Sequence, residues 1–287
     1  MTTRNNQERL NTDAASNVDS QQTNQQTQTL AFSVPTEFVD LPSRGQYYSK
    51  EHALHGINQV EIKHMTAKEE DILANTDLIQ KGVVIDRLLQ NIIMTPNVDV
   101  KDLLSGDKNA IILAARITGY GSDYKTIVAC PSCGHKSEKD FDLSDYETIG
   151  ASFDAQTLNE SLEGVQITDS ATFLTTLPKS EFEVEFRMLT GKDEQRIENF
   201  QKKSTSAGVL IDTLSMMIVS VNGIKDRLQI SEFAGNMPAM DSRFLRNLYQ
   251  KLVPNVDLKQ EFVCAKCNYE QAALGVPITT DFFWPQS

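Results

Sequence analysis

Four cysteines, spaced as two CxxC pairs, are the residues of this chain best suited to chemistry. They are Cys130 and Cys133 in the first pair and Cys264 and Cys267 in the second. A CxxC turn lets two thiolates reach one ion, and two such pairs complete the tetrahedral four-cysteine set of structural zinc. Each pair follows residues that favour a strand and precedes one that tolerates a left-handed backbone, Gly134 or Asn268. The pattern predicts two zinc knuckles that share one structural Zn²⁺ per chain.

Two other uses of these thiols stay open. A redox-active CxxC pair would start a helix after a strand and have a lowered thiol pKa, whereas the context CPSCGHKSEKDFDL favours a hairpin. Reduced thiols without a ligand are the second alternative. A closed site of four cysteines leaves no coordination position for water, so its contribution is folding stability rather than catalysis. His135 lies beside the first pair, and we expect it on the surface rather than on the metal.

The gap of 130 residues between the two pairs is long for a free-standing zinc ribbon, but the chain resembles itself on either side of it. The segments Gln59-VEIKHMTAKEEDIL and Glu183-VEFRMLTGKDEQRI each favour a strand followed by a helix. In each, a threonine, Thr66 or Thr190, is the expected N-cap, with acidic residues in the first helical turn. The matching blocks that follow in the same order are Gly82-VVIDRLLQNIIM with Gly208-VLIDTLSMMIV, Asp107-KNAIILAARITGYG with Asp241-SRFLRNLYQKLVPN, and Ile127-VACPSCG with Phe262-VCAKCN.

These matches predict an α+β fold with an internal duplication. We expect two related lobes of helices and strands, joined through a split zinc ribbon of two CxxC knuckles, with an extended N-terminal arm. Each lobe would donate one knuckle to the shared ion. The expected divisions are a disordered polar tail (1–30), an extended arm (31–58), a first repeat (59–146), a connector (147–181) and a second repeat with an aromatic C-terminus (182–287).

Composition and motifs argue against several function classes. Lys and Arg number 27 against 39 Asp and Glu, a net charge of -12, so we expect no nucleic-acid binding. No apolar stretch approaches the roughly 20 residues that span a bilayer, and no signal-peptide core is present. We therefore expect no stable membrane insertion and a cytoplasmic site of synthesis. Familiar catalytic motifs are missing, and His52, His55 and His64 are scattered. The chain is expected not to be an enzyme.

Two segments carry residue types that anchor protein interfaces. The motif LPSRGQYY has one arginine and two tyrosines, and DFFWPQS ends the chain with three aromatic residues. Packing of these side chains onto their own domain is the alternative to an exposed interaction surface. The candidate interaction residues are Arg44, Tyr47, Tyr48, Phe282, Phe283 and Trp284.

The segments LPSRGQYY, VEIKHMTAKEEDIL, LLSGDKNAIILAARITGYGSDY and CPSCG together resemble the baseplate hub subunit or hub-assembly family of contractile-tailed, T-even type bacteriophages. The resemblance implies a structural or assembly role at the tail tip without catalytic residues. It also implies other baseplate hub proteins and copies of the chain itself, in a symmetric ring, as partners. Assembly would occur in the host cytoplasm before incorporation into the virion tail. The alternatives are a transient hub-assembly chaperone absent from the virion and a zinc-ribbon nucleic-acid or transcription adaptor.

Overall fold

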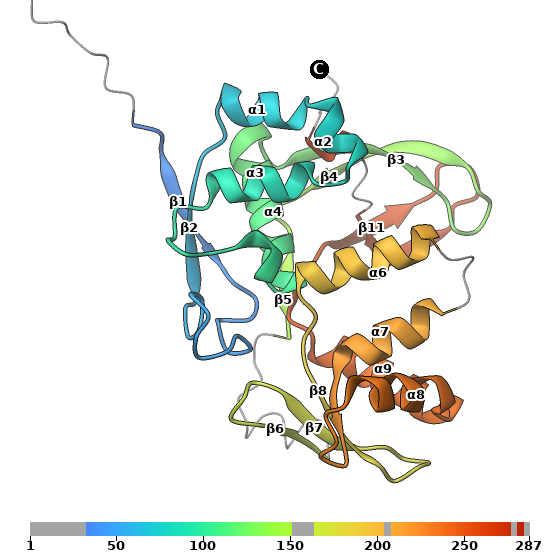
Figure 1. Cartoon of the computed structure of the whole chain (residues 1–287). Helices are drawn as coiled ribbons and strands as arrows, with labels where there is room; N and C mark the ends of the chain where they lie inside the picture. The colour runs from blue at the N-terminus through green and yellow to red at the C-terminus, as the bar shows by residue number, and fades with distance from the viewer. Residues whose placement is uncertain (1–32, 151–163, 204–207, 277–279, 284–287) are drawn as a thin grey trace, which may run out of the picture. The chain divides into compact units, whose positions relative to one another are not determined.

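The structure, a computed structural model, describes residues 33–150, 164–203, 208–276 and 280–283 (Figure 1). The expected disordered tail, residues 1–30, lies outside this part. As predicted, the described chain mixes helices with small sheets. The elements up to residue 150 are β1 (Thr36–Asp40), β2 (Gln59–Lys63), α1 (Ala67–Leu73), α2 (Thr76–Gln80), α3 (Val84–Ile92), η1 (Val100–Asp102), α4 (Ser105–Tyr120), β3 (Asp123–Ala129), β4 (Lys136–Asp142) and β5 (Glu147–Ile149).

The second half of the chain contains a similar succession of strands and helices. Its described elements are β6 (Val165–Ile167), β7 (Phe173–Thr176), β8 (Glu183–Phe186), α6 (Gly191–Lys203), α7 (Val209–Met217), β9 (Ile218–Val221), α8 (Arg227–Asn236), α9 (Ala239–Leu252), β10 (Asn255–Asp257), β11 (Lys259–Val263), β12 (Glu270–Gly275) and η2 (Thr280–Phe283).

The strands form small antiparallel sheets. The largest in the described residues has the order β6-β7-β8-β9, and the others are the pairs β1–β2, β3–β4, β5–β10 and β11–β12. The segment 147–181, expected to be a connector, therefore supplies β6 and β7 to the four-stranded sheet and β5 to a pair with β10. The β5–β10 pair joins strands more than 100 residues apart, from the two halves of the chain.

The predicted N-cap at Thr66 is confirmed. The Thr66 hydroxyl oxygen accepts from the backbone of the first turn of α1, and the Thr66 N–H donates to the Glu69 carboxylate, which together make a capping box. The Thr66 hydroxyl also donates to Glu69. Lys63, at the end of β2, places its Nζ 2.8 Å from a Glu69 oxygen. Glu69 is fully buried, so the cation and the cap together compensate its loss of water.

The second expected helix start has the same arrangement. Thr190 donates from both its backbone N–H and its hydroxyl to Asp193, each at 3.0 Å. Arg187 holds the same carboxylate with two hydrogen bonds of 2.8 and 3.0 Å. Asp193 is 3% exposed. In both segments, therefore, a basic residue six positions before the helical acid neutralises that acid.

A second kind of buried carboxylate ties helices to preceding turns. Asp107, the third residue of α4, is fully buried and accepts the backbone N–H of Ser43 at 2.9 Å. It also accepts the Ser43 hydroxyl at 2.5 Å and the Tyr48 hydroxyl at 2.8 Å. Burial raises the pKa of Asp107, and the hydrogen bonds from Ser43 and Tyr48 lower it. The turn after β1 thus closes on the start of α4.

Asp241 has the same role in the second half. It is the third residue of α9, is fully buried, and accepts the backbone N–H groups of Lys179 and Ser180 at 2.8 and 3.0 Å. These two residues follow Leu177 and Pro178, as Ser43 follows the Leu-Pro pair after β1. The expected Asp-led helices therefore use their aspartates to bind a distant turn rather than to cap themselves.

Contacts between the halves also form beside η1. The Gly191 N–H donates to the Leu103 carbonyl at 2.9 Å, and Leu104 forms an isolated β-bridge with Thr190. Lys192 adds an ion pair to Asp102 at 2.5 Å. Hydrogen bonds and an ion pair therefore hold the start of α6 against the segment that leads into α4.

Replacing Asp107 with Ala should lower the free energy of unfolding by at least about 3 kcal/mol, because three donors would lose their acceptor inside the protein. Urea denaturation measures this change. Asp145→Ala, at an exposed aspartate, is the control and should change stability by less than about 0.5 kcal/mol. Equal losses for the two variants would contradict the role assigned to Asp107.

Glu69→Gln should destabilise the protein in a pH-dependent way. Although burial raises it, the pKa of Glu69 is lowered from 4.5 to about 2 because Lys63 and Thr66 favour the carboxylate. A depressed folded-state pKa gives stability that is fully present above about pH 4.5 and is lost as the pH falls toward 2. The difference in unfolding free energy between wild type and variant, measured in urea at several pH values, should shrink over that window. A pH-independent difference would count against the charged form.

Candidate metal centre

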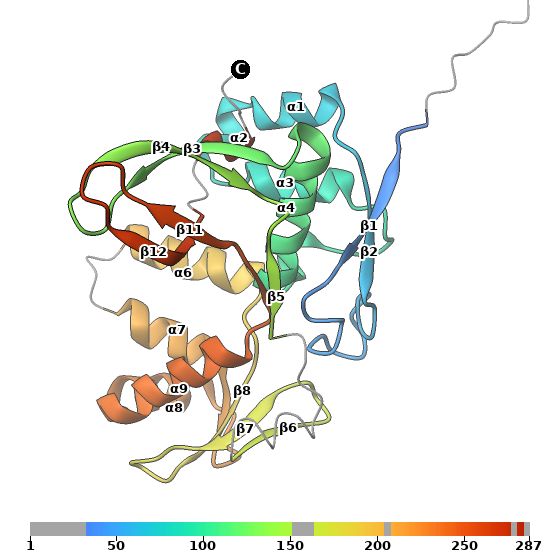
Figure 2. The same ribbon diagram turned by 180° about the vertical axis from the view of Figure 1, so that it is seen from behind.

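The four cysteines converge at the ends of two hairpins. Hairpin β3–β4 carries Cys130 and Cys133, and hairpin β11–β12 carries Cys264 and Cys267; the hairpins lie side by side in Figure 2. The Sγ atoms of Cys130 and Cys267 are 3.7 Å apart, and those of Cys133 and Cys264 are 3.8 Å apart. All four sulfurs lie within 4.8 Å of one another. Each close pair therefore joins the two halves of the chain.

The two turns have the same backbone geometry. In the first, the Cys130 N–H donates to the His135 carbonyl at 2.9 Å, and Gly134, at φ +68°, donates to the Cys130 carbonyl. In the second, the Cys264 N–H donates to the Tyr269 carbonyl at 2.9 Å, and Asn268, at φ +52°, donates to the Cys264 carbonyl. The predicted left-handed positions are confirmed. A residue with positive φ bends each turn so that both of its thiols face the same point.

The sulfur separations of 3.7 and 3.8 Å fit one tetrahedral metal ion. With metal–sulfur bonds of about 2.3 Å, neighbouring sulfurs of a tetrahedron lie about 3.8 Å apart. A disulfide would instead require about 2.05 Å, and all four cysteines are free thiols. Among the described residues, this is the one group of three or more metal-ligating side chains that converges in this way, and His135 is not part of it. The four thiols could therefore hold a metal ion without a histidine.

Charge within the cluster also favours a cation. Hydrogen bonds from the backbone of Cys267 and Lys266 lower the pKa of Cys264 to about 6. The Tyr269 backbone lowers the pKa of Cys267, but partial loss of hydration and the sulfurs of Cys133, Cys264 and Cys130 outweigh it and raise that pKa to about 12. One thiolate thus opposes ionisation of the next. A bound dication would remove this opposition, because metal ligands bind as thiolates.

Two further contacts hold the hairpins together. The Gln260 side chain on β11 donates to the Asp142 carbonyl on β4 and accepts the Asp142 N–H at 3.2 Å. Farther along the same strands, the Lys139 ammonium lies 5.6 Å from the centre of the Phe262 ring. Cys130 and Cys264 are buried, whereas Cys133 and Cys267 are exposed. The cluster therefore lies at the end of a packed seam, with one side open to solvent.

Four of the candidate interaction residues lie in the core. Tyr47, Tyr48, Phe282 and Phe283 are all at most 7% exposed. Tyr47 packs against the ring of Phe173 from the second half, and Phe282 packs edge-on against Tyr124. These four rings therefore pack within their own chain and do not form an exposed interaction surface. Arg44 is exposed at a positive φ of 49°, and Trp284 lies outside the described residues.

The scattered histidines do not meet in a common site. His52 stacks on the Tyr48 ring with centroids 4.3 Å apart, and His55 Nδ1 lies 2.8 Å from the Tyr48 carbonyl. His64 lies 3.9 Å from a Glu37 oxygen, beside the other end of the β1–β2 pair. His52 and His55 thus help to hold the turn that carries Tyr48.

The buried Arg116 was missed by sequence reasoning. Its side chain is fully buried on α4 and donates to the carbonyls of Phe282 at 2.6 Å, Gly121 at 2.6 Å and Asp123 at 3.0 Å. The guanidinium also lies 6.0 Å from the centre of the Phe282 ring. A single charge within the apolar run IILAARITGY was the signal for this role. Arg116 fixes η2, near the end of the chain, to the first half.

None of the helices in the described parts of the chain is long and apolar enough to cross a membrane.

The thiol cluster predicts one bound metal per chain, measurable by elemental analysis of protein purified without chelator. Cys264→Ser should weaken metal binding by more than about a hundredfold, because even the loss of an outer-shell partner costs roughly 10–100-fold. The matched control is His135→Ala, which removes a ring beside the knuckle and should leave the metal content unchanged. Metal-free wild-type protein would contradict the site.

Comparison with known proteins identifies the family. The family model described as T4 bacteriophage base plate protein matches residues 34–284, which include both hairpins and all four cysteines. Neither the curated proteins nor the solved structures contain a match. The match spans most of the chain and includes both of its halves. The chain therefore belongs to the T4 bacteriophage base plate protein family.

Proposed function

We propose that this chain is a non-enzymatic structural or assembly component of the baseplate hub of a contractile phage tail. The observation that carries the proposal is the family match over residues 34–284. The hub position is supported by the segments that resemble hub proteins, LPSRGQYY and CPSCG among them. The chain would assemble in the host cytoplasm, enter the tail baseplate of the virion, and bind other hub proteins and further copies of itself.

The proposal includes a structural Zn²⁺ held by Cys130, Cys133, Cys264 and Cys267. Sulfur separations of 3.7 and 3.8 Å and the closed set of four thiols support zinc over an open catalytic metal. When bound, the ion would supply cross-linking of the hairpins and no chemistry on a substrate. Because each pair comes from a different half, binding would be coupled to the packing of both halves.

An internal duplication would account for the paired features. Lys63 and Glu69 correspond to Arg187 and Asp193, each 124 positions later. The pairing of β2 with Ile93 likewise has a counterpart in that of β8 with β9. These repeated contacts, together with the two knuckles, support two related lobes that share one ion. The division into arm, first repeat, connector and second repeat follows from the same proposal.

Mass spectrometry of purified phage particles tests whether the chain is a component of the baseplate. We expect to find the protein in intact virions, and to find it as a larger fraction of total protein in isolated baseplates. Its presence in assembly intermediates together with its absence from virions would favour a transient assembly chaperone instead. Phage encoding Cys264→Ser should yield fewer baseplates at normal expression of the other tail proteins, whereas phage encoding His135→Ala should assemble normally. Normal assembly by both variants would contradict the zinc clamp but leave baseplate membership standing.

A further inference from the structure

The outer edge of β1 presents unpaired backbone groups. The Leu41 N–H donates to the Asn58 carbonyl, and the His64 N–H donates to the Pro35 carbonyl, which sets the alternation of the β1–β2 ladder. In an antiparallel ladder, alternate residues bond to the neighbouring strand. The N–H and C=O groups of the intervening residues therefore point away from β2. Within the described residues, β1 has no strand partner other than β2, so these groups are available to another strand. They belong to Thr36, Phe38 and Asp40.

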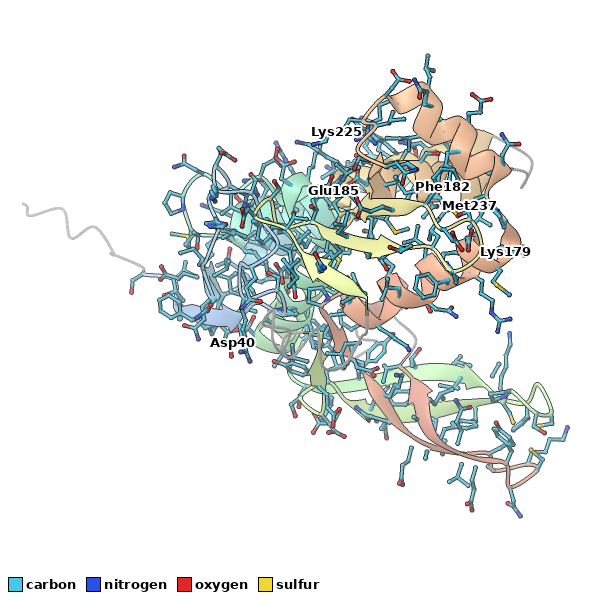
Figure 3. The ribbon with its side chains drawn as sticks, turned by 90° about the horizontal axis from the view of Figure 1, so that it is seen from below. Asp40, Lys179, Phe182, Glu185, Lys225 and Met237 are labelled. Carbon is cyan, nitrogen blue, oxygen red and sulfur yellow. The ribbon has the colours of Figure 1, made fainter. Side chains whose placement is uncertain are left out.

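The side chains along this edge are aromatic and acidic. Phe38 is 66% exposed, although it sits in a strand whose next residue, Val39, is buried. Asp40 is exposed on the same face. In Figure 3, Asp40 lies apart from Glu185, which belongs to the four-stranded sheet. Glu61 lies opposite Phe38 on β2. The exposed Phe38 ring therefore has the carboxylates of Asp40 and Glu61 beside it. This face would favour an added strand with basic side chains, because cations interact well with both the ring and the carboxylates.

In the second half of the chain, the strand that corresponds to β1 has another strand paired to its outer edge. There β7 precedes a Leu-Pro turn and pairs with β8, as β1 precedes a Leu-Pro turn and pairs with β2. The turn after each strand binds a buried aspartate, Asp107 or Asp241. The outer edge of β7, however, pairs with β6 in antiparallel register, and Val165 of β6 is buried. The same local architecture thus accommodates one more antiparallel strand at this position.

We propose that the β1 edge binds an extended segment of a partner protein by antiparallel strand addition. The segment would carry Lys or Arg facing Phe38 and Asp40, alternating with apolar residues toward the core side, because side chains alternate across a strand. A second copy of the chain fits less well. Its own β1, with the sequence TEFVD, would bring two acidic side chains and no basic one to this acidic edge. The inference goes beyond the proposed function, because it depends on the β1 edge alone.

Fluorescence anisotropy of the full chain with labelled peptides tests this inference. The probes are an alternating Lys–Val peptide of about eight residues and a Glu–Val peptide of the same length. We expect the Lys–Val peptide to bind at least about tenfold more tightly at low salt, and added salt to weaken it. The variant Phe38→Lys/Asp40→Lys should lower its affinity by at least about tenfold.

The matched control is Ile127→Lys/Glu138→Lys. Ile127 is also 66% exposed, Glu138 is its cross-strand neighbour on β4, and the variant changes the charge by the same amount. This control should leave peptide binding unchanged. Absent binding, equal binding of the two peptides, or equal effects of the two variants would overturn the proposal. It would also be overturned if the chain formed dimers in sedimentation that Phe38→Lys/Asp40→Lys abolished, because the edge would then belong to a second copy.

Discussion

Four sulfur atoms within 4.8 Å of one another cannot all carry a negative charge unless a cation lies among them. Here two of the sulfurs come from each half of the chain, and every close pair joins one half to the other. Bringing together two hairpins so far apart in the sequence carries a loop-closure entropy, which contacts between the hairpins and between the halves help to offset. The Gln260 hydrogen bonds, the Lys139–Phe262 contact and the β5–β10 pair supply them.

Acids at helix starts are buried in two ways in this fold. Glu69 and Asp193 are neutralised by a preceding basic residue, while Asp107 and Asp241 are satisfied by turn donors. A buried carboxylate without partners would be strongly destabilising, so each acid dictates where a strand end or a turn must lie. These contacts hold each hairpin turn close to its helix. They also position α4 and α9, the helices that precede the two cysteine-bearing hairpins in the chain.

The family and the geometry together suggest a structural component rather than an enzyme. A closed thiol site joins the halves, a buried Arg116 secures η2, and the aromatic rings first expected on the surface fill the core. The β1 edge offers a partner unpaired backbone groups beside the exposed side chains of Phe38 and Asp40. An unpaired strand edge suits a protein that assembles with others, because main-chain hydrogen bonds give strand addition its affinity while side chains set its specificity.

The sequence was enough to predict the four-cysteine cluster, the left-handed knuckle positions, the capped helix starts and the α+β class, because these depend on spacing and local backbone preference. It also carried the signature of the family. The positions of Tyr48 and Phe282 depend on packing, because an aromatic residue suits an interface and a core equally well until its neighbours are known. The partners of Asp107 and Arg116 were likewise beyond sequence reasoning. Their partners include turns and a chain end far along the sequence, and only packing brings these groups together.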